Sequence, residues 1–185
     1  MEILYYIAGF IVLLFVLVWF LQSNKEKKIN KIFSEQDGFD VTHKFISSFG
    51  KTAIAVDSNS KKIIFYDNKK LTSINFDELI SVETKINDET LHQTKRGSQI
   101  AGGAIGGLLL GPAGLLIGGL SGKKTTVQKI TKISVRATIS NIDKPFCDLV
   151  FYEGSPIKSD SFTHNIYSEL ADEWIGRLSV IISSN

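Results

Sequence analysis

The sequence is poor in the residues that most often reveal chemistry. It contains a single cysteine, Cys147, which excludes an intramolecular disulfide. Lys and Arg number 21 against 19 Asp and Glu, a balance too even to indicate nucleic-acid binding. Three histidines, His43, His92 and His164, stand far apart and not at metal-ligand spacing. We therefore expect no catalytic residues, no metal site and no cofactor, and predict that the protein is not an enzyme.

Phosphate-binding glycine loops are missing as well. In GGLSGKKT, Ile117 stands where a Walker loop needs its first glycine, and Lys124 stands where serine or threonine should follow the lysine. Ala104 likewise breaks a G-x-G-x-x-G reading that would begin at Gly102. Cys147 lies in a β-prone run, which favours a small packing residue over a nucleophile.

A long apolar run opens the chain. Residues 3–21, ILYYIAGFIVLLFVLVWFL, carry no charge, and nineteen residues at helical rise match the hydrocarbon core of a bilayer. Only Met1 and Glu2 precede the run, and no small-x-small exit follows it, which favours an uncleaved signal anchor over a cleaved signal peptide. The sequence therefore predicts a transmembrane helix within residues 1–23.

A basic juxtamembrane stretch, residues 24–38, follows the predicted span. Its lysines Lys25, Lys27, Lys28 and Lys31 have no basic counterpart before the span, so the positive-inside rule places the N-terminus outside and the rest in the cytoplasm. The same lysines either serve only as this orientation signal or also contact anionic lipid. Ile29, Ile32 and Phe33 recur at helical spacing, so the helix can continue until Asp37 and Gly38 end it.

Short β-prone runs make up most of the remainder. They alternate with turn sequences from residue 41 to about residue 86 and resume at residues 127–140 and 145–153. Residues 161–182 then form an amphipathic helix, capped by Asp160 or Ser161, with an apolar stripe of Ile166, Leu170, Trp174, Leu178 and Ile181. This helix needs an apolar surface to cover, and the sheet supplies one. The fold class is α+β.

This order of elements, with the phrases AIAVDSNSKKIIFYD and INFDELISVET and a tryptophan in the last helix, resembles the bacterial pleckstrin-homology-like (PH-like) domain. The resemblance implies a bent antiparallel sheet closed by the C-terminal helix, formed here by residues 39–96 and 124–185. It does not carry over a ligand site.

The insertion at residues 97–123 contains the stretch IAGGAIGGLLLGPAGLLIGGLSG, which has no charge. Glycines recur every four residues on either side of a Gly-Pro-Ala-Gly turn, a spacing that lets two helix backbones pack closely in lipid. It resembles a glycine-zipper helical hairpin, whose packing residues would be Gly103, Gly107, Gly111, Pro112, Gly114, Gly118 and Gly122.

Lysine or arginine on both sides of this segment marks both ends as cytoplasmic, and each arm reaches only about 16 Å. We therefore expect a re-entrant membrane hairpin. A hairpin buried in soluble protein remains an alternative, whereas a flexible linker would expose too many large aliphatic side chains.

Two functions of different classes follow. The first is a small bacterial or phage inner-membrane protein, a tethered PH-like binding or scaffold module that faces the cytoplasm. The alternative is a membrane-perturbing or channel-blocking factor, of the phage exclusion or defence type, that acts through oligomers of the hairpin. The expected partners are the lipid bilayer, further copies of the chain through the glycine faces, and a protein that the sequence does not identify, but not nucleic acid.

Overall fold

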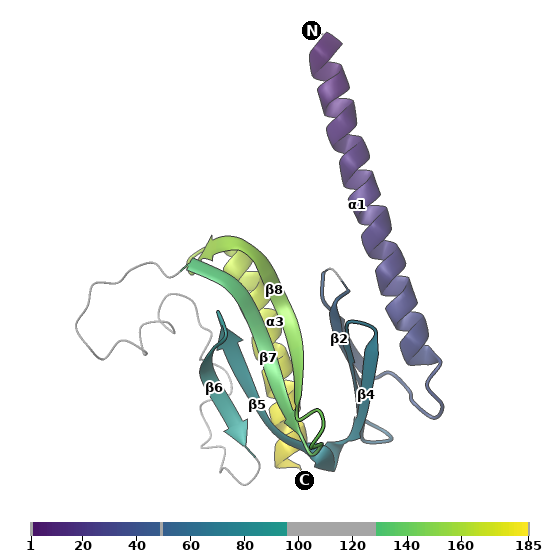
Figure 1. Ribbon diagram of the computed structural model, residues 1–185, viewed down its shortest axis with the longest axis vertical. Helices are drawn as coiled ribbons and strands as arrows, with labels where there is room; N and C mark the ends of the chain where they lie inside the picture. The colour runs from purple at the N-terminus through teal and green to yellow at the C-terminus, as the bar shows by residue number, and fades with distance from the viewer. Residues whose placement is uncertain (1, 49, 96–128, 185) are drawn as a thin grey trace, which may run out of the picture.

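Two long helices and eight strands form the part of the chain that the structure, a computed structural model, describes: residues 2–48, 50–95 and 129–184 (Figure 1). The helices are α1 (Glu2–Ser34) and α3 (Phe162–Ser183), with a short 3₁₀ turn, η1 (Phe76–Glu78). The strands are β1 (His43–Ile46), β2 (Thr52–Asp57), β3 (Lys62–Asp67), β4 (Lys70–Asn75), β5 (Leu79–Ile86), β6 (Glu89–Lys95), β7 (Lys129–Ile139) and β8 (Phe146–Lys158).

The strands form two antiparallel sheets of four. The first has the order β1-β2-β3-β4 and is a simple meander, whereas the second has the order β6-β5-β7-β8. The β3–β4 and β5–β6 hairpins turn through pairs of residues with positive φ, Asn68–Lys69 and Asn87–Asp88, as tight two-residue turns require. The sheets are joined by a hydrogen bond from the Val150 backbone N–H to Thr52 Oγ1 (3.0 Å).

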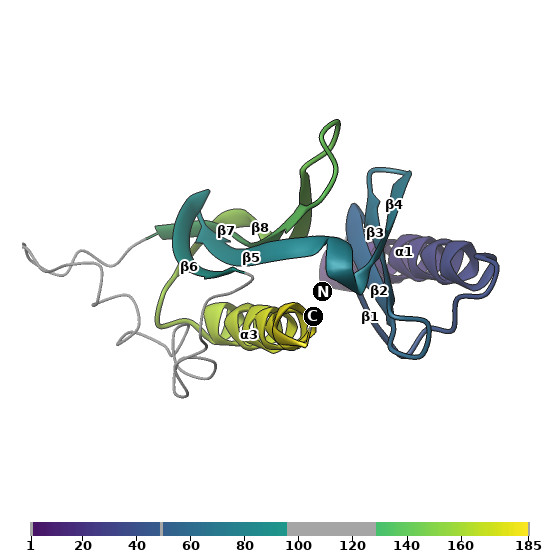
Figure 2. The same cartoon turned by 90° about the horizontal axis from the view of Figure 1, so that it is seen from below.

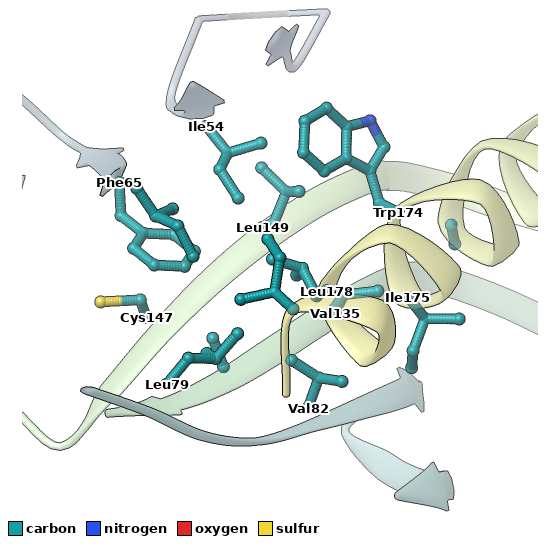
Figure 3. Close-up of a cluster of buried hydrophobic side chains, with 14 of the residues drawn as sticks. Ile54, Phe65, Leu79, Val82, Val135, Cys147, Leu149, Trp174, Ile175 and Leu178 are labelled. Carbon is teal, nitrogen blue, oxygen red and sulfur yellow. The ribbon is translucent and has the colours of Figure 1, made fainter. Parts of the chain in front are cut away.

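The main core fills the space between the two sheets and α3. Figure 3 shows Ile54 and Phe65 of the first sheet, Leu149 of the second and Trp174 of α3 directed toward this common interior. Phe45 and Phe151 stack with ring centroids 4.6 Å apart, which links the first strand of one sheet to the last strand of the other. The predicted α+β fold, with an antiparallel sheet structure packed against a C-terminal helix, is confirmed.

Helix α3 begins at the predicted cap. Ser161 accepts a hydrogen bond at Oγ from the His164 backbone N–H (3.2 Å), so Ser161 rather than Asp160 is the cap residue. Trp174, Leu178 and Ile181 of the predicted stripe are buried and Leu170 is partly buried, but Ile166 is 39% exposed. The buried face instead continues through residues beside the predicted stripe, namely Ala171, Ile175 and Ile182.

Helix α1 covers the outer face of the first sheet. Figure 2 shows α1 outside β1–β4, whereas α3 packs beneath the second sheet. Ile29 and Phe33 of α1 are 2% and 1% exposed and form a second, smaller core with side chains of β2 and β3: Ala53, Ala55, Ile64 and Tyr66. The first sheet is thus covered on both faces, which explains why every residue of β2 is buried.

Three sequence expectations need correction or fall outside the described residues. Strand β6 (Glu89–Lys95) was not expected, because the predicted strands stopped near residue 86. Ile166, on the predicted apolar stripe of the C-terminal helix, is exposed. The predicted glycine-zipper hairpin, with all its packing residues, lies outside the described residues.

Candidate membrane-facing site

The first part of α1 has the properties of a membrane-spanning segment. From Tyr5 to Leu21, its large apolar side chains are between 44% and 77% exposed, and the rest of the described chain does not cover them. In the described residues, α1 alone is long and apolar enough to cross a bilayer; by length and composition it suits an anchor or a signal sequence.

The last turns of α1 pack on the domain without a break in the helix. The helix is continuous from Glu2 to Ser34, and its buried residues Ile29 and Phe33 lie beyond the apolar run. Lys44 of β1 donates a hydrogen bond from Nζ to Asn30 Oδ1 (2.8 Å), which adds a polar contact between strand and helix. The apolar run and the β-domain therefore share one rigid element.

The four predicted juxtamembrane lysines divide between two sides of this helix. Lys25 and Lys28 line a cavity between α1 and the first sheet, and Lys27 does not. Lys31 lies outside that cavity and forms an ion pair with Glu35 (3.6 Å). The lysine run is therefore not a uniform basic patch.

Two loops of the first sheet form the opposite wall of the cavity. Gly50, in the β1–β2 loop, has φ +59°, and a Cβ at this position would lie 3.3 Å from Ile29 Cδ1 and from Lys25 Cβ. The Asn68 backbone N–H donates to the Lys51 carbonyl (2.8 Å), which fixes the β3–β4 turn against the start of β2.

The cavity between these walls is basic and large enough for a small ligand. Its volume is about 510 Å³, within the range of ligand pockets. Four lysines line it, two from α1 (Lys25 and Lys28) and two from the loops (Lys51 and Lys69). The other described lining residues are Ile29, Gly50, Tyr66 and Asn68, and none of the eight is acidic. Lys51 also forms an ion pair with Glu153 of β8 (3.1 Å).

A second cavity, of about 300 Å³, lies near the C-terminal end of α3. It is lined by residues of β1, β2, η1 and α3, among them His43, Phe76 and Ile181. Arg177, also in its lining, donates from Nε to Glu173 Oε1 (3.2 Å) and stacks over Trp174. Its charge is thus already engaged within α3.

The flanks of residues 96–128 are fixed to one sheet. Strands β6 and β7 both pair with β5, antiparallel, so they run parallel to each other on either side of it. Lys95 at the end of β6 pairs with Ser81, whereas Lys129 at the start of β7 lies beyond the Ile86–Ile133 pair at the other end of β5. The chain therefore leaves the sheet at one end and returns at the other.

Asn87 secures the returning strand. Its side chain donates to the Lys129 carbonyl (2.8 Å) and accepts from the Thr131 backbone N–H (2.9 Å). Its own backbone N–H donates to the Lys132 carbonyl (3.1 Å). One turn residue thus holds the first residues after the glycine-rich segment.

The remaining sequence candidates are dispersed. Cys147 is 2% exposed in the main core, and burial raises the pKa of its thiol, which agrees with the predicted packing role. His164 is buried in α3 with Nε2 3.1 Å from Ser168 Oγ, whereas His43 is exposed on β1. Within the described ranges there is no group of three or more side chains suited to bind a metal ion.

Comparison with known families gives one match. The family described as "Glycine zipper containing PH domain" matches residues 43–153, which run from β1 into β8 and make up more than half of the chain. The chain belongs to this family. The match covers the two sheets as far as Glu153 in β8 and includes the glycine-rich segment between β6 and β7, whereas α3 lies beyond it. No curated protein and no solved structure matches the chain significantly.

Membership in the PH family bears out the resemblance drawn from the sequence, but the basic cavity was not foreseen. The sequence placed Lys25 and Lys28 in one basic juxtamembrane run and did not connect them with Lys51 or Lys69. Only Gly50, beside Lys51 in a turn before β2, could have indicated that a loop approaches another element closely.

Proposed function

We propose that this protein is a membrane-anchored, non-enzymatic binding module of a bacterial or phage inner membrane, with its PH domain at the cytoplasmic face. The observation that carries the proposal is the continuity of α1. Its exposed apolar turns require lipid, and its last turns are part of the core of the first sheet. The proposed anchor helix is thus part of the folded domain and is not connected to it by a flexible linker.

The basic residues of α1 support the orientation. Lys25, Lys27 and Lys28 follow the apolar run at once, and lysine is retained on the cytoplasmic side of a span. The absence of enzymatic activity is proposed because Cys147 is buried in the core and His43 and His164 lie on separate elements. The binding partner is a lipid headgroup or a protein at the membrane surface.

Membrane extraction and cysteine labelling test this proposal. We would replace Cys147 by alanine and introduce Glu2→Cys or Ile142→Cys, the second at a side chain that is 98% exposed. The full chain should resist carbonate extraction and keep its N-terminal residues by mass spectrometry. An impermeant maleimide should label Glu2→Cys in intact cells and Ile142→Cys only after the membrane is opened. Extraction by carbonate, a chain shortened after the apolar run, or labelling of Ile142→Cys in intact cells would contradict the proposal.

A second candidate function remains for the glycine-rich segment. Because both of its flanks pair with β5 in one sheet, the segment would cross a membrane an even number of times or not at all. This arrangement suits a re-entrant hairpin that associates with other copies and perturbs the membrane. Gly107→Leu with Gly118→Leu should abolish cross-linked oligomers if this is the active part, whereas Gly107→Ala with Gly118→Ala should retain them. Oligomers and activity that survive the leucine pair would exclude it.

A further inference from the structure

We propose that the folded domain makes a second contact with the bilayer, at the corner where β8 ends and α3 begins. The β8–α3 corner consists of Lys158, Phe162 and Ile166, with Lys129 of β7 opposite Lys158. Its partner is the lipid interface, into which the ring of Phe162 inserts. This inference rests on the proposed function, because the corner reaches lipid only if the apolar run of α1 spans the bilayer.

Phe162 is an apolar side chain without an evident role in α3 itself. It is 79% exposed, a fraction that Ile142 alone exceeds among the described large apolar side chains. It is the first residue of the helix, but a hydrophobic staple would need apolar residues at positions 160 and 165, where Asp160 and Asn165 stand. An exposed aromatic ring that helix capping does not explain favours an external apolar partner.

The exposed side of α3 changes from apolar to acidic along the helix. Ile166 follows Phe162 by one turn and lies outside the buried face, and the exposed Glu169 and Glu173 come next on the same side. Glu169 is about 10 Å from Phe162 at helical rise, whereas the polar headgroup layer is roughly 5–7 Å thick on each side of the hydrocarbon core. With Phe162 at the inner edge of that layer, both glutamates reach water.

The corner lies at the end of the domain that faces the bilayer. Helix α1 is continuous and its last turns belong to the smaller core, so the apolar run has a fixed place relative to the sheets. Figure 1 shows the start of β7, the end of β8 and the start of α3 at the end of the second sheet toward which the N-terminal half of α1 extends. In the same view α3 runs roughly parallel to α1. An inserted α1 therefore brings the corner to the membrane surface.

The charges of the corner fit a shallow contact. Lys129 and Lys158 lie opposite each other on β7 and β8, both are exposed, and neither forms an ion pair with a described residue. Like charges in this position destabilise a strand pair, and the phosphate layer of a bilayer offsets that cost. Asp160 is exposed and is the single acidic residue in the sequence from 154 to 166. Insertion therefore stops at the ring of Phe162, as in helices that lie at the interface.

Spin labelling of the full chain in lipid nanodiscs tests this contact. In a Cys147→Ala background, a nitroxide is attached to Phe162→Cys at the corner, to Ile142→Cys as the matched control and to Val16→Cys as a reference within the apolar run. Ile142 is 98% exposed and lies beyond the other end of β7. All three labelled side chains are exposed, so each variant should fold, which circular dichroism checks. Collisions with oxygen, which concentrates in lipid, and with a nickel chelate, which stays in water, report the depth of each label.

The oxygen-to-nickel collision ratio should be several-fold higher for Phe162→Cys than for Ile142→Cys, and lower than for Val16→Cys. A ratio at Phe162→Cys equal to that at Ile142→Cys would overturn the contact. Low collision rates with both reagents at Phe162→Cys would show that protein covers the corner, and would overturn the assignment to lipid.

Hydrogen exchange of the unlabelled chain in the same nanodiscs provides a second measurement. Phe162→Ser should speed exchange several-fold in residues 155–166, because the corner loses its hold on the bilayer, and Ile142→Ser should leave that exchange unchanged. Exchange of the core-facing residues 171–182 of α3 should stay the same in both variants. Faster exchange there in Phe162→Ser would show a structural role for the ring and overturn the proposal, as would unchanged exchange in residues 155–166.

The outcomes separate this inference from the proposed function. A Val16→Cys label that is deep in lipid, together with a Phe162→Cys label in water, would overturn the corner contact alone. A Val16→Cys label that the nickel chelate reaches freely would overturn the proposed function, because α1 would then not be inserted in the bilayer.

Discussion

At the residue scale, Gly50 combines two constraints that only glycine meets. Its φ of +59° disfavours any Cβ, and the space for one is limited by Ile29 and Lys25 of α1. We expect Gly50→Ala to lower the free energy of unfolding by about 1–2 kcal/mol from backbone conformation alone, and further through the contact with α1.

The matched control is Gly38→Ala. Gly38 has a similar φ of +65° but no atom within 4 Å of an added Cβ, so it carries the backbone cost without the steric one. The difference between the two unfolding midpoints, measured by thermal denaturation in micelles, isolates the packing of the loop against α1. Equal midpoints for Gly50→Ala and Gly38→Ala would show that steric contact with α1 adds nothing to the cost at Gly50.

The environment of Asp172 predicts that the free energy of unfolding depends on pH. Burial, followed by the nearby charge of Glu169, raises the pKa of the half-buried Asp172 carboxyl from 3.8 to about 6. A raised pKa in the folded state means that ionised Asp172 destabilises the fold, so stability falls as pH rises from about 4 to about 6. Asp172→Asn should raise the unfolding midpoint at pH 7, and this gain should vanish below pH 4. Asp143→Asn, at an exposed side chain between β7 and β8, serves as the control and should change the unfolding midpoint little.

At the element scale, the docking of α1 on the first sheet depends on Ile29 and Phe33. Phe33→Ala removes a side chain that is 1% exposed and should cost about 3–5 kcal/mol within the smaller core. Because the main core is a separate cluster, the sheets and α3 should persist while the last turns of α1 loosen. Hydrogen exchange should therefore rise in residues 25–34 and on β2 and β3, more than on β7. Ile142→Ala, at a side chain that is 98% exposed, should leave exchange unchanged.

The turn residue Asn87 governs the strand that follows the glycine-rich segment. Asn87→Ala removes four hydrogen bonds between the Asn87 side chain and the start of β7 and places alanine at φ +51°. We expect a loss of about 2–3 kcal/mol, seen as a lower unfolding midpoint. Asn87→Gly tolerates the positive φ but also lacks the side-chain hydrogen bonds, so it should recover only the part of the loss that comes from backbone conformation. An unfolding midpoint unchanged in both variants would contradict a role of Asn87 in holding β7.

Elements with a strong apolar pattern could be predicted from the sequence, and those fixed by tertiary contacts could not. Strand β2 and helix α3 carry dense apolar patterns, and their positions agree with the structure. Strand β6, ETLHQTK, is polar and is defined by its pairing with β5, so its sequence alone gave no sign of it. Ile166 lies on the predicted apolar stripe of α3 but outside the face of the helix that is buried. A helical period in the sequence shows that a helix has an apolar face but does not define the edges of that face.

At the scale of the whole molecule, the strand order sets a minimum length for the connection between β6 and β7. The last residue of β6 and the first residue of β7 are roughly 30 Å apart along the direction of β5, at about 3.3 Å per residue. A six-residue glycine–serine linker in place of residues 96–128 reaches only about 20 Å, so the second sheet should fail to form. A sixteen-residue linker should restore it, as judged by the unfolding midpoint and by circular dichroism. A fold that tolerates the six-residue linker would contradict the crossover.

The residues that line the basic cavity come from distant parts of the chain, which is why the sequence did not predict the cavity. The basic cavity joins Lys28 to Lys69, residues of separate elements, and no local spacing indicates that they meet. The resemblance to PH domains predicted one bent antiparallel sheet and the closing helix, but neither the division into two sheets nor the packing of α1 on the outer face of β2 and β3. That contact arises because Ala53 and Ala55 leave room on the sheet for Ile29 and Phe33.

The unbroken α1 fixes the rotation of the PH domain about the axis of its own apolar segment. A helix advances about 100° per residue, so a single residue inserted between Gln22 and Ser23 would rotate the domain by more than a quarter turn while moving it only about 1.5 Å. The side of the apolar helix on which each face of the domain lies is therefore set by helical phase and not by a flexible connection.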